Sequence, residues 1–113
     1  MNVTTAQHGA ASIVTVNESR LTYPVLADFA TAAADLIARG EKRIVIDLAS
    51  VGYVDSATIG CLMDLYRQAT AAGGRLKLAG VQKRVETMLT MTGAHHFLEV
   101  YVDQPAALAS FGG

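Results

Sequence analysis

An aspartate and a serine, Asp55 and Ser56, stand between two largely apolar stretches in the segment YVDSATIG. Both residue types favour the first position of a helix, where a side-chain oxygen accepts a hydrogen bond from an unpaired main-chain N–H. A helix start is also electropositive and suits a phosphate group. The small neighbours Ala57 and Gly60 would let another protein approach the Ser56 hydroxyl closely. The pair therefore predicts either a helix cap alone or a hydroxyl that projects from a docking surface at a natural phosphate site.

The other reactive residues form no catalytic or metal-binding pattern. Ser56 lacks the G-x-S-x-G context of a hydrolase nucleophile. Besides His8, the histidines are the neighbours His95 and His96, which an extended segment would point to opposite sides. Cys61 is expected to be a small buried side chain, and there is no Gly-rich phosphate loop. We expect a protein that is not an enzyme and that holds no cofactor or metal.

The composition predicts a folded chain without nucleic-acid or membrane chemistry. Of the 113 residues, 51% are hydrophobic and 17% are charged, which argues against disorder. A formal net charge of −1 provides no basic excess for binding a nucleic acid. The single cysteine, the absence of a secretory leader and the absence of about 20 consecutive apolar residues predict a cytoplasmic protein without membrane insertion. We expect one domain over residues 1–113.

The elements before the polar pair alternate between extended and helical patterns. Two β-branched runs, 2–7 and 12–16, predict a hairpin. Apolar residues at helical spacing follow over 21–40, with Thr22 able to cap the helix and Pro24 tolerated in its first turn. This order places a strand pair and a helix ahead of the next strand.

The second half of the chain continues the alternation. Residues 43–48 predict a strand covered on both faces. Next are expected a helix from Ser56 to Gly73, a strand at 75–80, a helix at 81–93, a strand at 97–102 and a last helix begun by Asp103 and Pro105. This order predicts an α/β fold, in which an N-terminal hairpin plus βαβ units form a mixed sheet of about four to five strands backed by about four helices.

The segment RIVIDLASVGYVDSATIGCLMDLYRQATAAGGRLKLAGVQKRVETMLTMTG resembles the core of the STAS domain. This family contains sulfate transporter domains and bacterial anti-sigma factor antagonists. Its members carry an apolar strand ending in Asp-Leu, a short loop, an Asp-Ser helix start, a Gly-Gly break, and a helix closing in Ser/Thr-Gly. The resemblance extends from about Ser12 to about Leu108, which is nearly the whole chain.

This resemblance implies a phosphorylation switch at Ser56. In STAS antagonists the serine after the aspartate is phosphorylated by the anti-sigma factor, a serine kinase with a histidine-kinase-like ATPase fold, and a PP2C-type phosphatase restores it. The unphosphorylated form binds the kinase and frees the sigma factor, so that transcription is regulated by partner switching. Such a bacterial protein is expected to be a monomer or a weak homodimer. The implied partner-binding residues are Asp55, Ser56, Ala57, Thr58, Ile59 and Glu18.

Two departures from the family pattern leave alternatives open. Thr58 replaces a common glycine and is the second choice for phosphorylation. The segment NESRLT replaces the family's Gly-Glu-Leu-Asp, so that Glu18 can substitute for the acidic residue near the kinase while Arg20 reverses a charge. This segment favours a non-switching STAS scaffold subunit of an ABC lipid-transport complex or of a stressosome. An enzyme acting through Ser56 ranks last.

Overall fold

β-branched and aliphatic runs form a mixed five-stranded sheet in the computed structural model, which describes residues 2–23 and 25–112. The sheet order is β1-β2-β4-β6-β7, and only the β1–β2 pair is antiparallel. The predicted N-terminal hairpin followed by parallel strands is therefore confirmed. The strands are β1 (Val3–His8), β2 (Ala11–Val16), β4 (Arg43–Asp47), β6 (Arg75–Ala79) and β7 (Val100–Tyr101).

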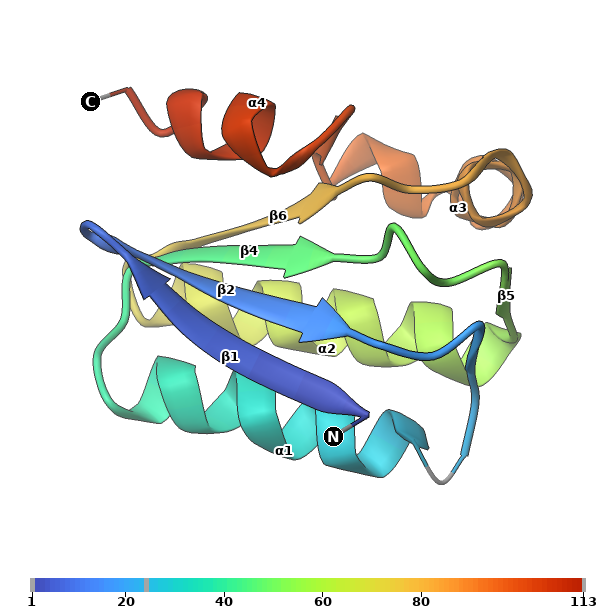
Figure 1. Ribbon diagram of the computed structural model, residues 1–113, viewed down its shortest axis with the longest axis horizontal. Coiled ribbons are helices and arrows are strands. Elements are labelled where there is room, and N and C mark those ends of the chain that lie inside the picture. The colour runs from blue at the N-terminus through green and yellow to red at the C-terminus, as the bar shows by residue number, and fades with distance from the viewer. Residues whose placement is uncertain (1, 24, 113) are drawn as a thin grey trace.

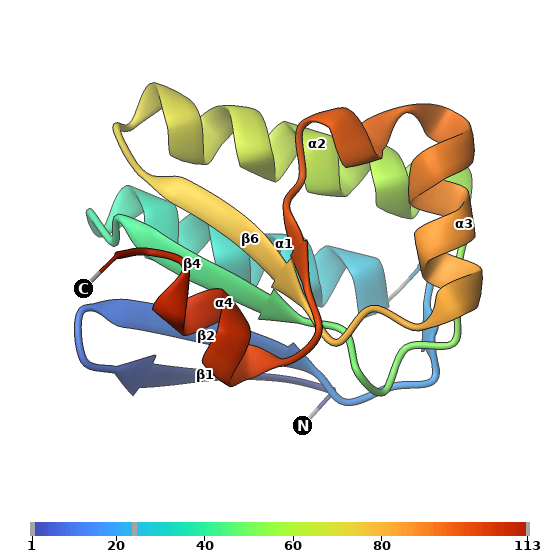
Figure 2. The same ribbon diagram turned by 90° about the horizontal axis from the view of Figure 1, so that it is seen from above.

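Four helices in the described residues pack around this sheet, three of them over its two faces (Figure 1). Helices α1 (Val25–Ala38) and α2 (Ser56–Ala71) cover one face, and α4 (Gln104–Ala109) lies over the other. Helix α3 (Lys83–Thr92) lies beyond the carboxyl ends of β4 and β6 (Figures 1 and 2). The predicted α/β class is confirmed. The predicted position of Pro24 in the first turn of a helix lies outside the described residues.

Strand β4 shows why the sheet is apolar on both faces. Ile44 and Ile46 pack into the large core under α1 and α2, whereas Val45 packs into a smaller core that includes Ala107 and Phe111. The three central side chains of β4 are 0% exposed, as expected for a strand covered on both sides. Because α4 is short, the face that it covers holds fewer apolar side chains.

A second sheet, which the sequence pattern does not predict, lies next to the start of α2. It consists of the short strands β3 (Arg20–Leu21) and β5 (Tyr53–Val54), which pair in parallel. Two-residue strands are too short to show a period-2 pattern. This pair brings the NESRLT segment alongside the residues that lead into Ser56.

The predicted strand at 97–102 is wrong for most of its length. Only Val100 and Tyr101 pair with β6. Gly93 ends α3 with a φ of 81°, and a short 3-10 helix, η1 (Ala94–His96), follows at once. The expectation that His95 and His96 point to opposite sides is also wrong, since this turn holds their ring centroids 4.0 Å apart.

Candidate functional site

Helix α2 begins at Ser56 because Asp55 caps it. The Asp55 backbone is extended, with φ −114° and ψ −179°, and its carboxylate Oδ1 accepts a hydrogen bond of 2.9 Å from the Thr58 main-chain N–H. This geometry satisfies one of the unpaired N–H groups of the first helical turn. The prediction of a cap at this junction is confirmed, with Asp55 rather than Ser56 in that role.

Ser56 is the first residue of α2, and its side chain is exposed. Among the described residues, no group forms a hydrogen bond with the Ser56 hydroxyl. Ala57 is exposed as well, and so is Gly60, where an added Cβ would meet no atom within 4 Å. The Ser56 hydroxyl therefore projects from a surface of small residues with no structural bond of its own.

Thr58 has the opposite environment, although it lies only two residues further along α2. Its side chain is 0% exposed. The Thr58 hydroxyl lies within hydrogen-bond distance of the Leu21 carbonyl in β3 and of the Asp55 carboxylate, and its single proton is donated to one acceptor at a time. A kinase would have to open the first turn of α2 to reach this hydroxyl, so the second-choice site is disfavoured.

The electrostatic environment of Ser56 is set by an ionised carboxylate. Hydrogen bonds from the Thr58 main-chain N–H and from the Thr58 hydroxyl hold the pKa of Asp55 below its usual value. A phosphate on Ser56 would therefore stand beside a negative charge, while the positive end of the α2 dipole partly offsets the repulsion.

The structure separates the other predicted partner-binding residues. Ile59 is only 4% exposed and belongs to the core, so its side chain offers little surface. Glu18 is half-buried in the loop before β3. Because the parallel register pairs Leu21 with Val54, Glu18 lies at the opposite end of the β3–β5 pair from Ser56. Glu18 and Ser56 are therefore not brought together.

One contact and one exposed aromatic side chain next to this site were not apparent from the sequence. The guanidinium carbon of Arg20 lies 4.4 Å from the centroid of the Tyr53 ring, a cation–π arrangement on β3 and β5. Tyr23, which follows β3, is 82% exposed. The pairing of β3 with β5 brings Arg20 and Tyr53 together, although they lie far apart in the sequence. An Arg and a Tyr that lie far apart in sequence give no spacing signal for this contact.

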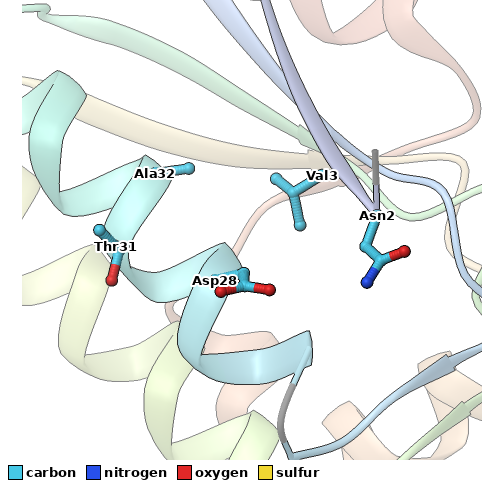
Figure 3. Close-up of a pocket in the computed structure, with 5 residues that line it drawn as sticks. All are labelled: Asn2, Val3, Asp28, Thr31 and Ala32. Atoms are coloured by element: carbon cyan, nitrogen blue, oxygen red, sulfur yellow. The ribbon is translucent and has the colours of Figure 1, made fainter.

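Other candidate groups offer no catalytic arrangement. Burial and the nearby Asp64 raise the pKa of the Cys61 thiol, which is the opposite of activation. A hollow of about 570 Å³ between β1 and α1 is lined by Asn2, Val3, Asp28, Thr31 and Ala32, none of which is a predicted site residue (Figure 3). Within residues 2–23 and 25–112 no group of three or more acidic, histidine or cysteine side chains is placed to hold a metal.

None of the helices described is long and apolar enough to cross a bilayer.

The sheet order, the capping aspartate and the exposed serine together define a STAS domain. The chain belongs to the family described as "Mlab, STAS domain", whose model matches residues 3–100. A protein of Thermotoga neapolitana that carries the name of an anti-sigma factor antagonist is 24% identical over 79 residues, which are 70% of each chain.

Solved structures show the same fold at low sequence identity. A Thermotoga maritima protein with the same kind of name superposes with a TM-score of 0.86 and 19% identity over 96% of this chain and 92% of that chain. The phosphorylated form of Bacillus SpoIIAA superposes with a TM-score of 0.75 and 13% identity over 96% and 98%. Its unphosphorylated form gives a TM-score of 0.74 and 16% identity over 98% of both chains. At these identities the comparisons show the fold.

Proposed function

We propose that this chain is an anti-sigma factor antagonist whose binding is switched by phosphorylation of Ser56. In the unphosphorylated form it binds an anti-sigma factor serine kinase of the histidine-kinase-like ATPase fold, in the cytoplasm. The kinase phosphorylates Ser56, the complex dissociates, and a PP2C-type phosphatase restores the binding form. The chain itself acts as a binding module and contributes no catalytic residue. The observation that carries the proposal is the exposed Ser56 hydroxyl, which forms no hydrogen bond among the described residues.

The location of Ser56 supports reversible modification. The cap is made by Asp55, so α2 does not depend on the Ser56 hydroxyl for its first turn. A phosphate can therefore be added and removed while α2 stays formed. SpoIIAA, a fold relative named as an anti-sigma factor antagonist, has been solved in both unphosphorylated and phosphorylated forms. This pair of structures supports a fold that tolerates the modification.

The expected loss of affinity for the partner on phosphorylation follows from the added negative charge. A phosphoserine carries about −1.5 to −2 charges at neutral pH. Since Asp55 beside it is ionised, a partner covering Ser56 would have to bury two neighbouring negative groups. A penalty of several kcal/mol corresponds to roughly 100-fold or more in affinity, because each 1.4 kcal/mol is tenfold. Loss of the complex on phosphorylation is the expected outcome.

Mass spectrometry of the protein isolated from its native cells tests the modification directly. Intact-mass and fragment spectra should show one phosphate on the peptide that contains YVDSATIG, located on Ser56. A Ser56→Ala protein expressed in the same cells is the matched control and should carry none. Absence of phosphate from the wild-type protein across growth and stress conditions would contradict the switch.

A non-switching scaffold is the second candidate. The Arg20–Tyr53 contact favours it, because it holds a cation in the segment where the family's antagonists carry an acidic residue near the kinase. That contact puts a cation, at 4.4 Å from the ring, on the strand pair that leads into Ser56. In such a scaffold, a STAS subunit of an ABC lipid-transport complex or of a stressosome, Ser56 would remain unmodified. Co-purification of the tagged chain distinguishes the two: an ABC-type ATPase supports the scaffold, whereas a histidine-kinase-like protein supports the switch.

A further inference from the structure

Three cationic side chains gather where β4 and β6 begin. Arg43 and Arg75 are register partners on these adjacent parallel strands, and Lys42 directly precedes Arg43. Side chains of register partners project from the same face of a sheet, so the Arg43 and Arg75 side chains are neighbours. Like charges placed side by side on a sheet destabilise it unless something neutralises them. The repulsion between Arg43 and Arg75 would therefore be relieved by a bound negative charge.

These cations line a hollow together with the end of α4. The hollow has a volume of about 220 Å³, and its walls are Lys42, Arg43, Gly73, Arg75 and Phe111. None of these five residues carries a carboxylate. We call this hollow the basic hollow.

None of the three cations is neutralised by an ion pair within the described residues. The ion pairs found there involve Arg39, Arg67 and Lys77 instead. The ammonium group of Lys42 donates to the Ala72 carbonyl at the end of α2, which occupies one of its three N–H donors. Arg75 interacts electrostatically with Glu99 without forming an ion pair, so all three cations keep N–H donors that an external anion can use.

Two cationic groups lie close to Phe111, the aromatic residue that lines the basic hollow. The Arg43 guanidinium carbon lies 6.0 Å from the centroid of the Phe111 ring, and the buried Lys77 ammonium lies 4.6 Å from the same centroid. The Glu99 carboxylate lies 3.6 Å from Lys77 Nζ and also interacts electrostatically with Arg75. Glu41, next to Lys42 in sequence, is bound to Ser12 and Gln7 instead. Over residues 2–23 and 25–112, cations therefore outnumber carboxylates around the hollow.

We propose that the basic hollow binds a phosphate group, through the guanidinium groups of Arg43 and Arg75 with Lys42 as a third cation. Guanidinium donors match the oxygen spacing of a phosphate and bind it in a bidentate manner. A bound phosphate would also relieve the repulsion between the two register partners. The phosphate belongs either to a small soluble compound or to a lipid headgroup, which share this chemistry.

This site is independent of the proposed switch. The parallel strands β4 and β6 begin at the basic hollow and run toward the opposite end of the sheet, where α3 and the start of α2 lie (Figures 1 and 2). A ligand in the basic hollow and a partner at Ser56 would therefore occupy different ends of the domain. Failure of one proposal leaves the other unaffected.

The test is a titration of the full chain with inorganic phosphate and pyrophosphate at constant ionic strength, followed by ¹H–¹⁵N NMR. We expect saturable shifts at the amides of Lys42, Arg43 and Arg75. The Arg43→Gln/Arg75→Gln protein should bind at least tenfold more weakly. The control protein, Lys83→Gln/Arg84→Gln, loses two exposed charges of α3 and should bind as the wild type does.

A second arm separates the two sources of the phosphate. Co-sedimentation with phosphatidylglycerol vesicles but not phosphatidylcholine vesicles, lost in the Arg43→Gln/Arg75→Gln protein, identifies a lipid headgroup. Saturable binding of the free phosphates without co-sedimentation identifies a soluble ligand. Equal binding by all three proteins, or no binding in either arm, would overturn the proposal. Should the double variant fail to fold, Arg75→Gln alone serves, because the Arg75 side chain is exposed.

Discussion

The side chain of Thr58 in α2 is hydrogen-bonded to the main-chain carbonyl of Leu21 in β3. This contact joins the start of α2 to the short β3–β5 pair. Leu21 is itself the register partner of Val54, which leads into Asp55 and Ser56. The position of Ser56 is therefore fixed from two sides, through the chain from β5 and through the buried first turn of α2.

Replacing Thr58 with valine tests that connection. Valine keeps the shape of the side chain but removes the hydroxyl, which leaves the Leu21 carbonyl without this donor in a buried place. We expect the free energy of unfolding to fall by about 1–3 kcal/mol. Urea unfolding measures it, with Thr87→Val as the control, since the exposed Thr87 hydroxyl bonds only the Lys83 carbonyl of its own helix. A loss no larger than that of the control would contradict the role given to Thr58.

Removal of the cap should weaken α2. The Asp55→Ala change deletes the carboxylate that accepts from the Thr58 N–H. The expected cost is about 0.5–2 kcal/mol of unfolding free energy. Asp64→Ala is the matched control, because Asp64 is an exposed carboxylate of the same helix, 3.7 Å from Arg67, and such a pair contributes at most about 1 kcal/mol. Equal losses in the two proteins would mean that Asp55 is not the cap.

The pH dependence of stability should carry the signature of Asp55. Because its pKa is lower in the folded state, the carboxylate stabilises the fold above its unfolded pKa, and the contribution is lost as pH falls through the folded pKa. The difference in unfolding free energy between the wild type and Asp55→Asn should therefore be constant near neutral pH and shrink below about pH 4. Denaturant titrations across this range measure it. A difference that stays unchanged in acid would argue against an ionised Asp55 in the cap.

Substitutions at Ser56 should change binding without changing the fold. Because the side chain is exposed and forms no hydrogen bond among the described residues, Ser56→Ala and Ser56→Asp should each alter the unfolding free energy by no more than about 0.5 kcal/mol. Binding to a kinase recovered with the wild-type chain should persist in Ser56→Ala and fall by roughly 100-fold in Ser56→Asp. Equal affinity of the two variants for that kinase would rule out the switch.

The main sheet and its helices could be predicted because their sequence signals are long. The apolar run of β4 and the helical spacing of α2 each extend over a whole element, and Asp55 and Asp103 mark helix starts that the structure confirms. The short elements could not be predicted in the same way. Strands β3 and β5 hold two residues each, and their pairing is fixed by tertiary contacts such as that between Thr58 and Leu21.

The candidate site was predictable in position and less so in detail. The junction at Ser56 has a local signal, whereas the burial of Thr58 depends on helical phase. Thr58 falls in step with Leu62, Leu65 and Ala69, the buried side of α2, and this spacing was present in the sequence. The location of Glu18 depends on the β3–β5 register, which no local pattern shows. The grouping of Arg43 with Arg75 depends likewise on strand pairing.

Strand β1 lies at one edge of the main sheet and pairs with β2 over all six of its residues. Its sequence, VTTAQH, contains no lysine, no proline and no acidic residue. These are the residues that usually prevent an edge strand from pairing with another chain. The unpaired N–H and C=O groups on the outer side of this strand can pair with a strand of another molecule, so purified samples are expected to aggregate at high concentration. A single Thr5→Lys change at this exposed position should therefore slow aggregation in concentrated samples, and light scattering measures this.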